Sequence, residues 1–262
     1  MRKEDFKKWI RNKRITFWEK AWYVVKPFLV YMVLKSVAML TLAMLLPMLP
    51  IDGMAVWVED HSRMLNAVVN GAASLIAVAF LLNDFLKEVA TAGEVNIDAG
   101  IPRQLLTFLR RGFWGYDDVN GVGLALCAGG GAVAAFVLNE AVVLLLALLR
   151  LDSARYASVE EIQYSVPLWL GLLLYGVISP IVEEIVFRGI LYNRMKRFFG
   201  IPACVILTAL LFGGFHANLP QFAYGTCMGI LLALCYEIEG SFAAPVLFHM
   251  AANVFVFLLS FS

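Results

Sequence analysis

Charged residues are scarce in this sequence, and the common signatures of soluble active sites are missing. Only 16% of the 262 residues are charged and 61% are hydrophobic, whereas soluble domains are about a quarter charged and about half apolar. The net charge of +1 gives no electrostatic basis for binding nucleic acid, so no nucleic-acid partner is predicted. Neither an H-E-x-x-H nor a C-x-x-C motif occurs. The composition indicates a protein that crosses a membrane several times.

Cysteine is also rare, and its four positions are scattered through apolar runs. Without paired spacing, these cysteines are not expected to form disulfides or metal sites. They are predicted to be small side chains of the core: Cys127, Cys204, Cys227 and Cys235.

Long apolar runs divide the chain into candidate membrane spans. A helix needs about 20 apolar residues to cross a bilayer, and the runs predict an all-α, polytopic transmembrane helix bundle with about seven or eight spans. The run at 119–149 is too long for one straight span. It is either one tilted helix or a helix broken near Gly129–Gly131 that crosses twice. The predicted spans lie at about 27–49, 64–86, 119–149, 167 to beyond 183, 201–216, 221–236 and 242–260.

The chain is expected to have three parts. Residues 1–26 contain nine Lys or Arg with aromatic residues between them, which is typical of an amphipathic helix on an anionic bilayer surface or of a basic tail. Both interpretations place the N-terminus in the cytoplasm. Residues 27–165 are predicted to form N-terminal transmembrane helices, and residues 166–262 the catalytic helices. The compact, basic sequence suggests a multi-pass protein of a bacterial plasma membrane.

Two residues interrupt the predicted spans. Lys35 lies inside the first span, where it either extends toward the headgroups or pairs with an acid that faces inward, and packing is favoured over function. Pro180 lies three residues before Glu183, and its missing N–H group is expected to kink the fourth span.

Polar side chains of catalytic type lie in three apolar segments of the last third of the chain. A charged side chain at the bilayer centre costs roughly 2.5 to 3.5 kcal/mol, so such groups face the bundle interior and find partners there. Residues four apart share a helix face, so each pair within a motif can point inward. The motifs are E-E-x-x-x-R (Glu183, Glu184, Arg188), F-x-x-x-H (Phe212, His216) and H-x-x-x-N (His249, Asn253).

The three segments also agree in depth. Glu183 lies 17 residues before the turn at Gly200, and His216 lies 16 residues after it. An antiparallel helix pair therefore places the two side chains level, roughly 20 to 25 Å from the turn at 1.5 Å per residue. His249 lies about 14 Å into its own helix by the same rise. A carboxylate, two imidazoles and an amide are thus predicted to converge on one pocket in the membrane.

This constellation suits peptide hydrolysis, which needs an activated water and donors for the oxyanion. Glu183 is predicted as the general base, with His216 sharing or orienting the water. His249 and Asn253 would then donate to the oxyanion. Glu184 and Arg188 are expected to set the charge and position of Glu183.

Other interpretations of the same residues stay open. Glu183, His216 and His249 make a possible zinc set with an open water position, although a directly acting glutamate without a cofactor is favoured. Buried glutamate and histidine also serve proton relays in transporters.

The motifs resemble those of the CPBP family of intramembrane peptidases, which includes CAAX prenyl proteases of the Ras-converting type and bacterial bacteriocin-processing and immunity proteins. The resemblance implies an all-helical membrane fold. It also implies that Glu183 and His216 activate the water and that His249 and Asn253 stabilise the oxyanion, by a metal-free mechanism. The matching residues are 183–188 for the first motif, Phe212 and His216 for the second, and His249 and Asn253 for the third.

The resemblance implies an intramembrane endopeptidase that acts on a peptide or a lipidated protein at the lipid bilayer. The substrate is either a prenylated CAAX-type protein or a small peptide. A non-catalytic immunity or scaffold protein of the same fold is the alternative from another class. The sequence does not determine the oligomeric state.

Overall fold

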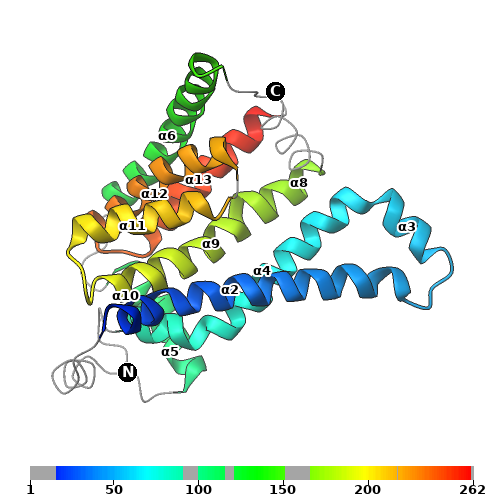
Figure 1. Ribbon diagram of the computed structural model, residues 1–262, viewed down its shortest axis with the longest axis horizontal. Helices are drawn as coiled ribbons and strands as arrows, with labels where there is room; N and C mark the ends of the chain where they lie inside the picture. The colour runs from blue at the N-terminus through cyan, green and yellow to red at the C-terminus, as the bar shows by residue number, and fades with distance from the viewer. Residues whose placement is uncertain (1–15, 91–99, 116–120, 151–165, 217, 261–262) are drawn as a thin grey trace.

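The computed structural model describes residues 16–90, 100–115, 121–150, 166–216 and 218–260, and all its regular elements are helical (Figure 1). Residues 1–15 of the predicted interfacial segment lie outside the described residues. The elements are α2 (Phe17–Leu45), η1 (Leu46–Met48), α3 (Met54–Asp60), α4 (Ser62–Ala90), α5 (Ile101–Thr107), η2 (Phe108–Gly112), α6 (Gly121–Leu148), α8 (Leu168–Gly171), η3 (Leu172–Ile178), α9 (Ser179–Glu184), η4 (Ile185–Tyr192), α10 (Asn193–Met195), α11 (Ile201–Gly214), α12 (Leu219–Glu239) and α13 (Ala243–Leu259).

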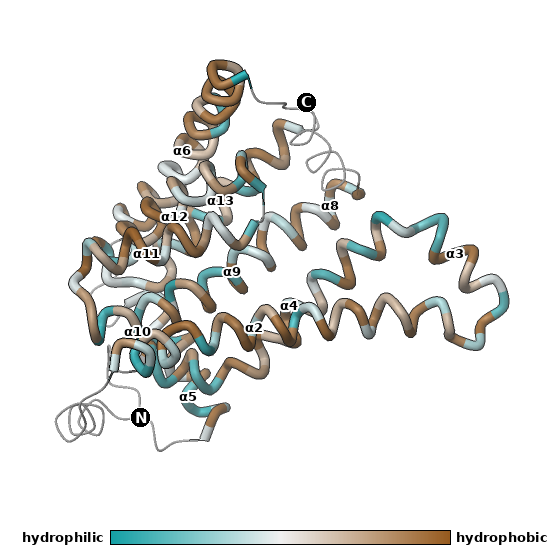
Figure 2. The backbone as a smooth tube through the Cα atoms, viewed as in Figure 1, coloured by the Kyte–Doolittle hydropathy of each residue, from teal (hydrophilic) through white to brown (hydrophobic). Residues whose placement is uncertain are grey.

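The prediction of an all-α polytopic bundle is confirmed. Five helices in the described part of the chain are long and apolar enough to cross a membrane, and α11 and α13 are two shorter apolar helices. Large apolar side chains are exposed along α2 and α6, as expected of surfaces that face lipid. Figure 2 shows these apolar helices, with hydrophilic residues gathered around α10 and where α3 meets α4.

The first spanning helix begins earlier than predicted. α2 starts at Phe17, ten residues before the predicted start at Pro27. The side chain of Thr16 accepts a hydrogen bond from the Glu19 backbone N–H, and the Glu19 carboxylate accepts one from the Thr16 N–H. This capping box satisfies two of the free donors of the first turn. Residues 17–26 therefore continue the same helix as the predicted first span.

The long run at 119–149 forms one unbroken helix, α6 (Gly121–Leu148). The glycines in its middle do not break it, and α13 packs directly on one of them, Gly131. A Cβ atom at Gly131 would lie 2.1 Å from the carbonyl oxygen of Phe248. Only glycine lets the two backbones approach so closely. The contact holds the backbone of α13 one residue before His249.

A central helix runs from Leu168 to Met195 and contacts helices on both of its sides (Figure 1). Two π-helical segments, η3 and η4, flank the short α9 within it. In the first, the N–H of Ser179 donates to the carbonyl of Leu174, five residues back. The widened turn comes just before Pro180, which has no N–H to donate, and π-helical turns recur at functional sites. A kink was predicted at Pro180, and the structure has a change of helical pitch at this position.

The antiparallel pair α11 and α12 packs closely through small residues. A Cβ atom at Gly229 would lie 2.8 Å from the Cα of Ala209, and one at Gly225 would lie 3.1 Å from the Cα of Gly213. The small-x-x-x-small spacing of α12 therefore does permit close helix packing, as predicted. One consequence is that the backbone carbonyl of Gly229 comes within reach of the central helix.

Buried ion pairs join the end of the central helix to α2 and α4. Arg194, which is 8% exposed, donates to Glu88 and Asp84 at 3.0 Å and to the carbonyl of Tyr23 at 3.1 Å. Arg197 also pairs with Glu88. Arg194 at the end of the central helix and Arg197 just after it therefore connect three helices.

We expect that Gly131→Ala lowers the thermal midpoint of the protein in detergent. The added methyl group collides with the Phe248 backbone, and overpacking of this kind costs about 1 to 3 kcal/mol. Gly129→Ala is the matched control, because nothing lies within 4 Å of a Cβ atom at that position. Equal thermal midpoints for the two variants would contradict the packing argument.

Candidate active site

Glu184 and Arg188 form an ion pair in the middle of the bundle, and both side chains are 0% exposed. Arg188 Nη1 donates to Glu184 Oε1 at 2.9 Å, and Nη2 donates to the Gly229 carbonyl at 2.9 Å. The guanidinium also lies over the ring of Phe212, 4.9 Å from its centroid. A buried ion pair is tolerated only when further contacts offset its desolvation. Here α11 and α12 supply those contacts.

The same carboxylate oxygen reaches His249 on α13. Glu184 Oε1 lies 2.9 Å from His249 Nδ1, and a carboxylate can only accept, so Nδ1–H is the donor. The ring is buried and is fixed by this bond. Glu184 therefore orients His249, whereas the sequence predicted that Glu184 and Arg188 would act on Glu183.

Glu183 lies beside His249 with one oxygen already bonded. Ser179 Oγ donates to Glu183 Oε1 at 2.6 Å. The other oxygen, Oε2, lies 3.8 Å from His249 Nε2, which is longer than a hydrogen bond. Glu183 also interacts electrostatically with Tyr31 and Lys35 of α2. Oε2 of Glu183 and Nε2 of His249, which make no hydrogen bond within the described part of the chain, thus lie side by side.

His216 lies in the turn just after α11 and is half-buried. Its Nδ1 lies 3.0 Å from the carbonyl oxygen of Phe212, to which Nδ1–H donates. In the neutral ring this leaves Nε2 as an acceptor. The ring of Phe212 packs edge-on against both histidines, 5.3 Å from His216 and 5.7 Å from His249 between ring centroids. Phe212 thereby connects the second and third motifs, although His216 and Glu183 make no hydrogen bond.

Asn253 is held by the first π-helical segment. Its Nδ2 donates to the carbonyl of Tyr175 at 2.9 Å, and it lies one turn beyond His249 on α13. The amide makes no contact with Glu183 at hydrogen-bonding distance. Of the predicted residues, Glu183, Glu184, Arg188 and His249 form one connected cluster. His216 is linked to this cluster by the Phe212 ring, which packs against both histidines, and Asn253 lies on the same helix as His249.

The sequence did not reveal several partners in this site. Ser179 has a local signal, because it precedes Glu183 by four residues and so shares its helix face. The carbonyls of Gly229 and Tyr175 have none, because backbone groups of distant helices become partners only through tertiary packing. Lys35 and Tyr31 also come from a distant helix.

A zinc site needs three protein ligands around one point. Within the described ranges, no group of three or more His, Cys, Asp or Glu is placed to hold a metal ion. Glu183, His216 and His249 are therefore not assembled as a ligand set. The four cysteines are free thiols; Cys127 and Cys204 are buried, whereas Cys227 is exposed, so the prediction of a core position is wrong for Cys227.

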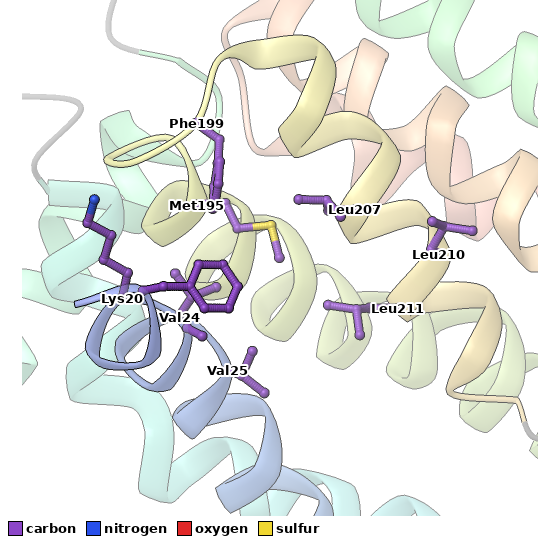
Figure 3. Close-up of a pocket in the computed structure, with 10 residues that line it drawn as sticks. Lys20, Val24, Val25, Met195, Phe199, Leu207, Leu210 and Leu211 are labelled. Atoms are coloured by element: carbon purple, nitrogen blue, oxygen red, sulfur yellow. The ribbon is translucent and has the colours of Figure 1, made fainter.

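An apolar pocket lies between α2, α10 and α11 (Figure 3). Its volume is about 320 Å³, and Lys20 is the one charged residue in its lining. Val25 and Leu211 line it, and the same two helices carry Tyr31 and Phe215, whose ring centroids are 6.2 Å apart. At 1.5 Å per residue, the pocket lies about 6 to 9 Å along these helices from the aromatic pair beside the site.

Comparisons with known proteins find a family model and a relative that are similar to part of this chain. Residues 165–255 match the family model described as type II CAAX prenyl endopeptidase Rce1-like. The protein named "Putative membrane peptidase YdiL" of Bacillus subtilis (strain 168) is 28% identical over 112 residues, which are 41% of this chain and 43% of that protein. The alignment thus spans less than half of the relative. No solved structure matches this chain.

The matched segment contains all three motifs, together with α8 to α12 and most of α13, whereas α2, α4 and α6 lie outside it. The resemblance seen in the sequence is confirmed by this match: residues 165–255 are similar to the type II CAAX prenyl endopeptidase Rce1-like family.

Proposed function

We propose that this integral membrane protein is an intramembrane endopeptidase that hydrolyses a peptide bond of a membrane-associated substrate. One observation carries the proposal. Glu183 Oε2 and His249 Nε2 lie 3.8 Å apart, and the other polar atom of each side chain is occupied by Ser179 and Glu184. The one oxygen and the one nitrogen that can still bind a water molecule therefore lie next to each other. Activation of a water molecule needs such an arrangement.

Glu183 is the general base in this proposal. Its Oε2 takes a proton from water, and the water oxygen attacks the carbonyl carbon of the scissile bond. The proton then passes from Glu183 to the leaving nitrogen as the C–N bond breaks, so the products are a carboxyl group and an amine. The bond from Ser179 supports this role, because it fixes Oε1 and leaves Oε2 for the water. His216, with Nε2 as an acceptor, is proposed to orient the same water.

His249 and Asn253 are proposed to stabilise the oxyanion. Asn253 uses one Nδ2 hydrogen on the Tyr175 carbonyl, which leaves the second for the developing charge. His249 can donate from Nε2 only when its ring holds both protons, and the carboxylates of Glu183 and Glu184 balance that charge. Donors that are fixed before the reaction cost no reorganisation during it. Arg188 contributes by holding Glu184, and through it His249.

The substrate is proposed to be a peptide with an apolar attachment, either a prenylated protein with a CAAX-type end or a small hydrophobic peptide. The family match over residues 165–255 and the apolar pocket between α2 and α11 support this class. The active site lies among spanning helices, so a substrate that partitions into the bilayer reaches it from the lipid. We further propose that the protein resides in a bacterial plasma membrane with a cytoplasmic N-terminus, in accord with its basic first segment.

We expect that Glu183→Gln abolishes cleavage of a quenched fluorescent, C-terminally prenylated peptide by the purified protein in detergent. Loss of a general base lowers kcat by about 10² to 10⁴-fold, and the amide keeps the size of the side chain. Glu140→Gln is the matched control, because Glu140 is an exposed acid on α6, outside the cluster.

Full activity of the Glu183→Gln variant would refute the proposed base. If wild type and both variants cleave neither a prenylated nor an unprenylated peptide, the non-catalytic immunity or scaffold function becomes the better explanation. A cellular phenotype that survives Glu183→Gln would support that function.

We also expect that a zinc chelator leaves the cleavage rate of the wild-type protein unchanged. The proposed base acts directly, and the candidate ligands are not assembled around a common point. The measurement is the initial rate before and after prolonged chelation, with a zinc peptidase as the positive control for the chelator. Loss of activity that added zinc restores would overturn the metal-free mechanism.

A further inference from the structure

Lys35 is a charged residue deep inside a spanning helix. It lies 18 residues after Phe17 and 10 before Leu45 on α2, or about 27 Å and about 15 Å along the axis. Aromatic side chains at the start of α2 are exposed, as is typical of the membrane interface. Lys35 is therefore too far from that end of the helix to reach the headgroups there.

The ammonium group of Lys35 has aromatic neighbours but no ion pair among the described residues. Its Nζ lies 5.3 Å from the ring centroid of Phe215 and 6.0 Å from that of Tyr31. The other basic side chains near the central helix, Arg188, Arg194, Lys196 and Arg197, each pair with a carboxylate within 4.0 Å. An ammonium group has three donors, and those of Lys35 make no hydrogen bond to the described part of the chain.

The position of Lys35 places it beside the proposed active site. Its charge interacts with that of Glu183, and the Phe215 ring that it contacts precedes His216 and packs against it at 5.5 Å. α2 lies outside the segment that matches the family model. Lys35 thus comes from the N-terminal half of the chain, whereas the three motifs of the site lie in the C-terminal half.

Charge balance suggests what this cation does. While the His249 ring is neutral, Arg188 compensates Glu184, so Glu183 leaves the cluster with one uncompensated negative charge. Like charges repel strongly where the dielectric is low, and this charge would oppose any substrate that carries a carboxylate near the scissile bond. Lys35 offsets it, and its free donors can bind such a carboxylate directly.

We propose that Lys35 binds a carboxylate of the peptide substrate, and this inference rests on the proposed endopeptidase function. The carboxylate belongs either to the C-terminus of the peptide, when the cut lies near it, or to an Asp or Glu side chain close to the scissile bond. Each extended residue spans about 3.5 Å, so the carboxylate lies within a few residues of the bond that Glu183 hydrolyses. Substrate selection then depends on α2 as well as on residues 165–255, the family segment.

The test compares peptides that differ only in their carboxylates. One pair has a free or an amidated C-terminus, and a second pair has Glu or Gln beside the scissile bond. For the wild-type protein we expect kcat/KM to be about tenfold or more higher for the acid in one of these pairs, since hydrogen bonds to charged groups contribute that much. Lys35→Met should remove this preference, and Lys35→Arg should retain most of it.

Lys26→Met is the matched control, because Lys26 is an exposed lysine on the same helix. It loses the same charge and should keep the wild-type preference. If Lys35→Met lowers kcat/KM equally for the acid and the neutral peptides, Lys35 acts only as a counter-charge or packing residue and the inference is overturned. Equal rates for both members of each pair with wild type would overturn it as well.

A binding measurement separates this inference from the peptidase function. Fluorescence anisotropy of the same labelled peptides with Glu183→Gln protein, alone and combined with Lys35→Met, needs no hydrolysis. A preference for the acid that disappears with Lys35→Met supports the inference even if wild type cleaves none of the peptides, in which case the proposed function alone fails. Equal binding of acid and neutral peptides counts against Lys35 even if wild type cleaves them.

Discussion

The buried contact of Glu184 with Arg188 and His249 is the constraint on which the rest of the site depends. One carboxylate oxygen joins the central helix to α13, and the arginine joins both to α12 through the Gly229 carbonyl. In a medium without water, none of these groups can be left without its partner at small cost. These three helices are therefore fixed in rotation as well as in position, and that rotation turns Glu183 toward His249.

Backbone features of the helices make this contact possible. The π-helical turns around α9 change the direction in which its side chains point, and the Tyr175 carbonyl in one of them accepts from Asn253. Glycine lets α6 approach the carbonyl just before His249, and lets α12 lie against α11. Small residues at helix contacts and irregular pitch at a polar site are two ways in which this membrane bundle positions polar groups in its interior.

Helices outside the family segment also shape the site. α2 and α4 are fastened to the end of the central helix by Arg194 and Arg197, and α2 then runs past the site with Tyr31 and Lys35. The apolar pocket lies between this helix and α11 (Figure 3). The family segment thus holds the groups proposed for the chemistry, while the N-terminal helices border the space through which a substrate would be recognised.

The sequence by itself determined the all-helical membrane architecture, because long apolar runs in a bilayer have no alternative to helices. It also brought out the three motif segments and the pairing of Glu184 with Arg188, since residues four apart share a helix face. Only the tertiary structure decided that Glu184 orients His249, that α6 is unbroken, and that Lys35 lies beside the site. The reason is physical: the rotation of each helix about its axis depends on contacts between residues far apart in the chain, and no local pattern specifies those contacts.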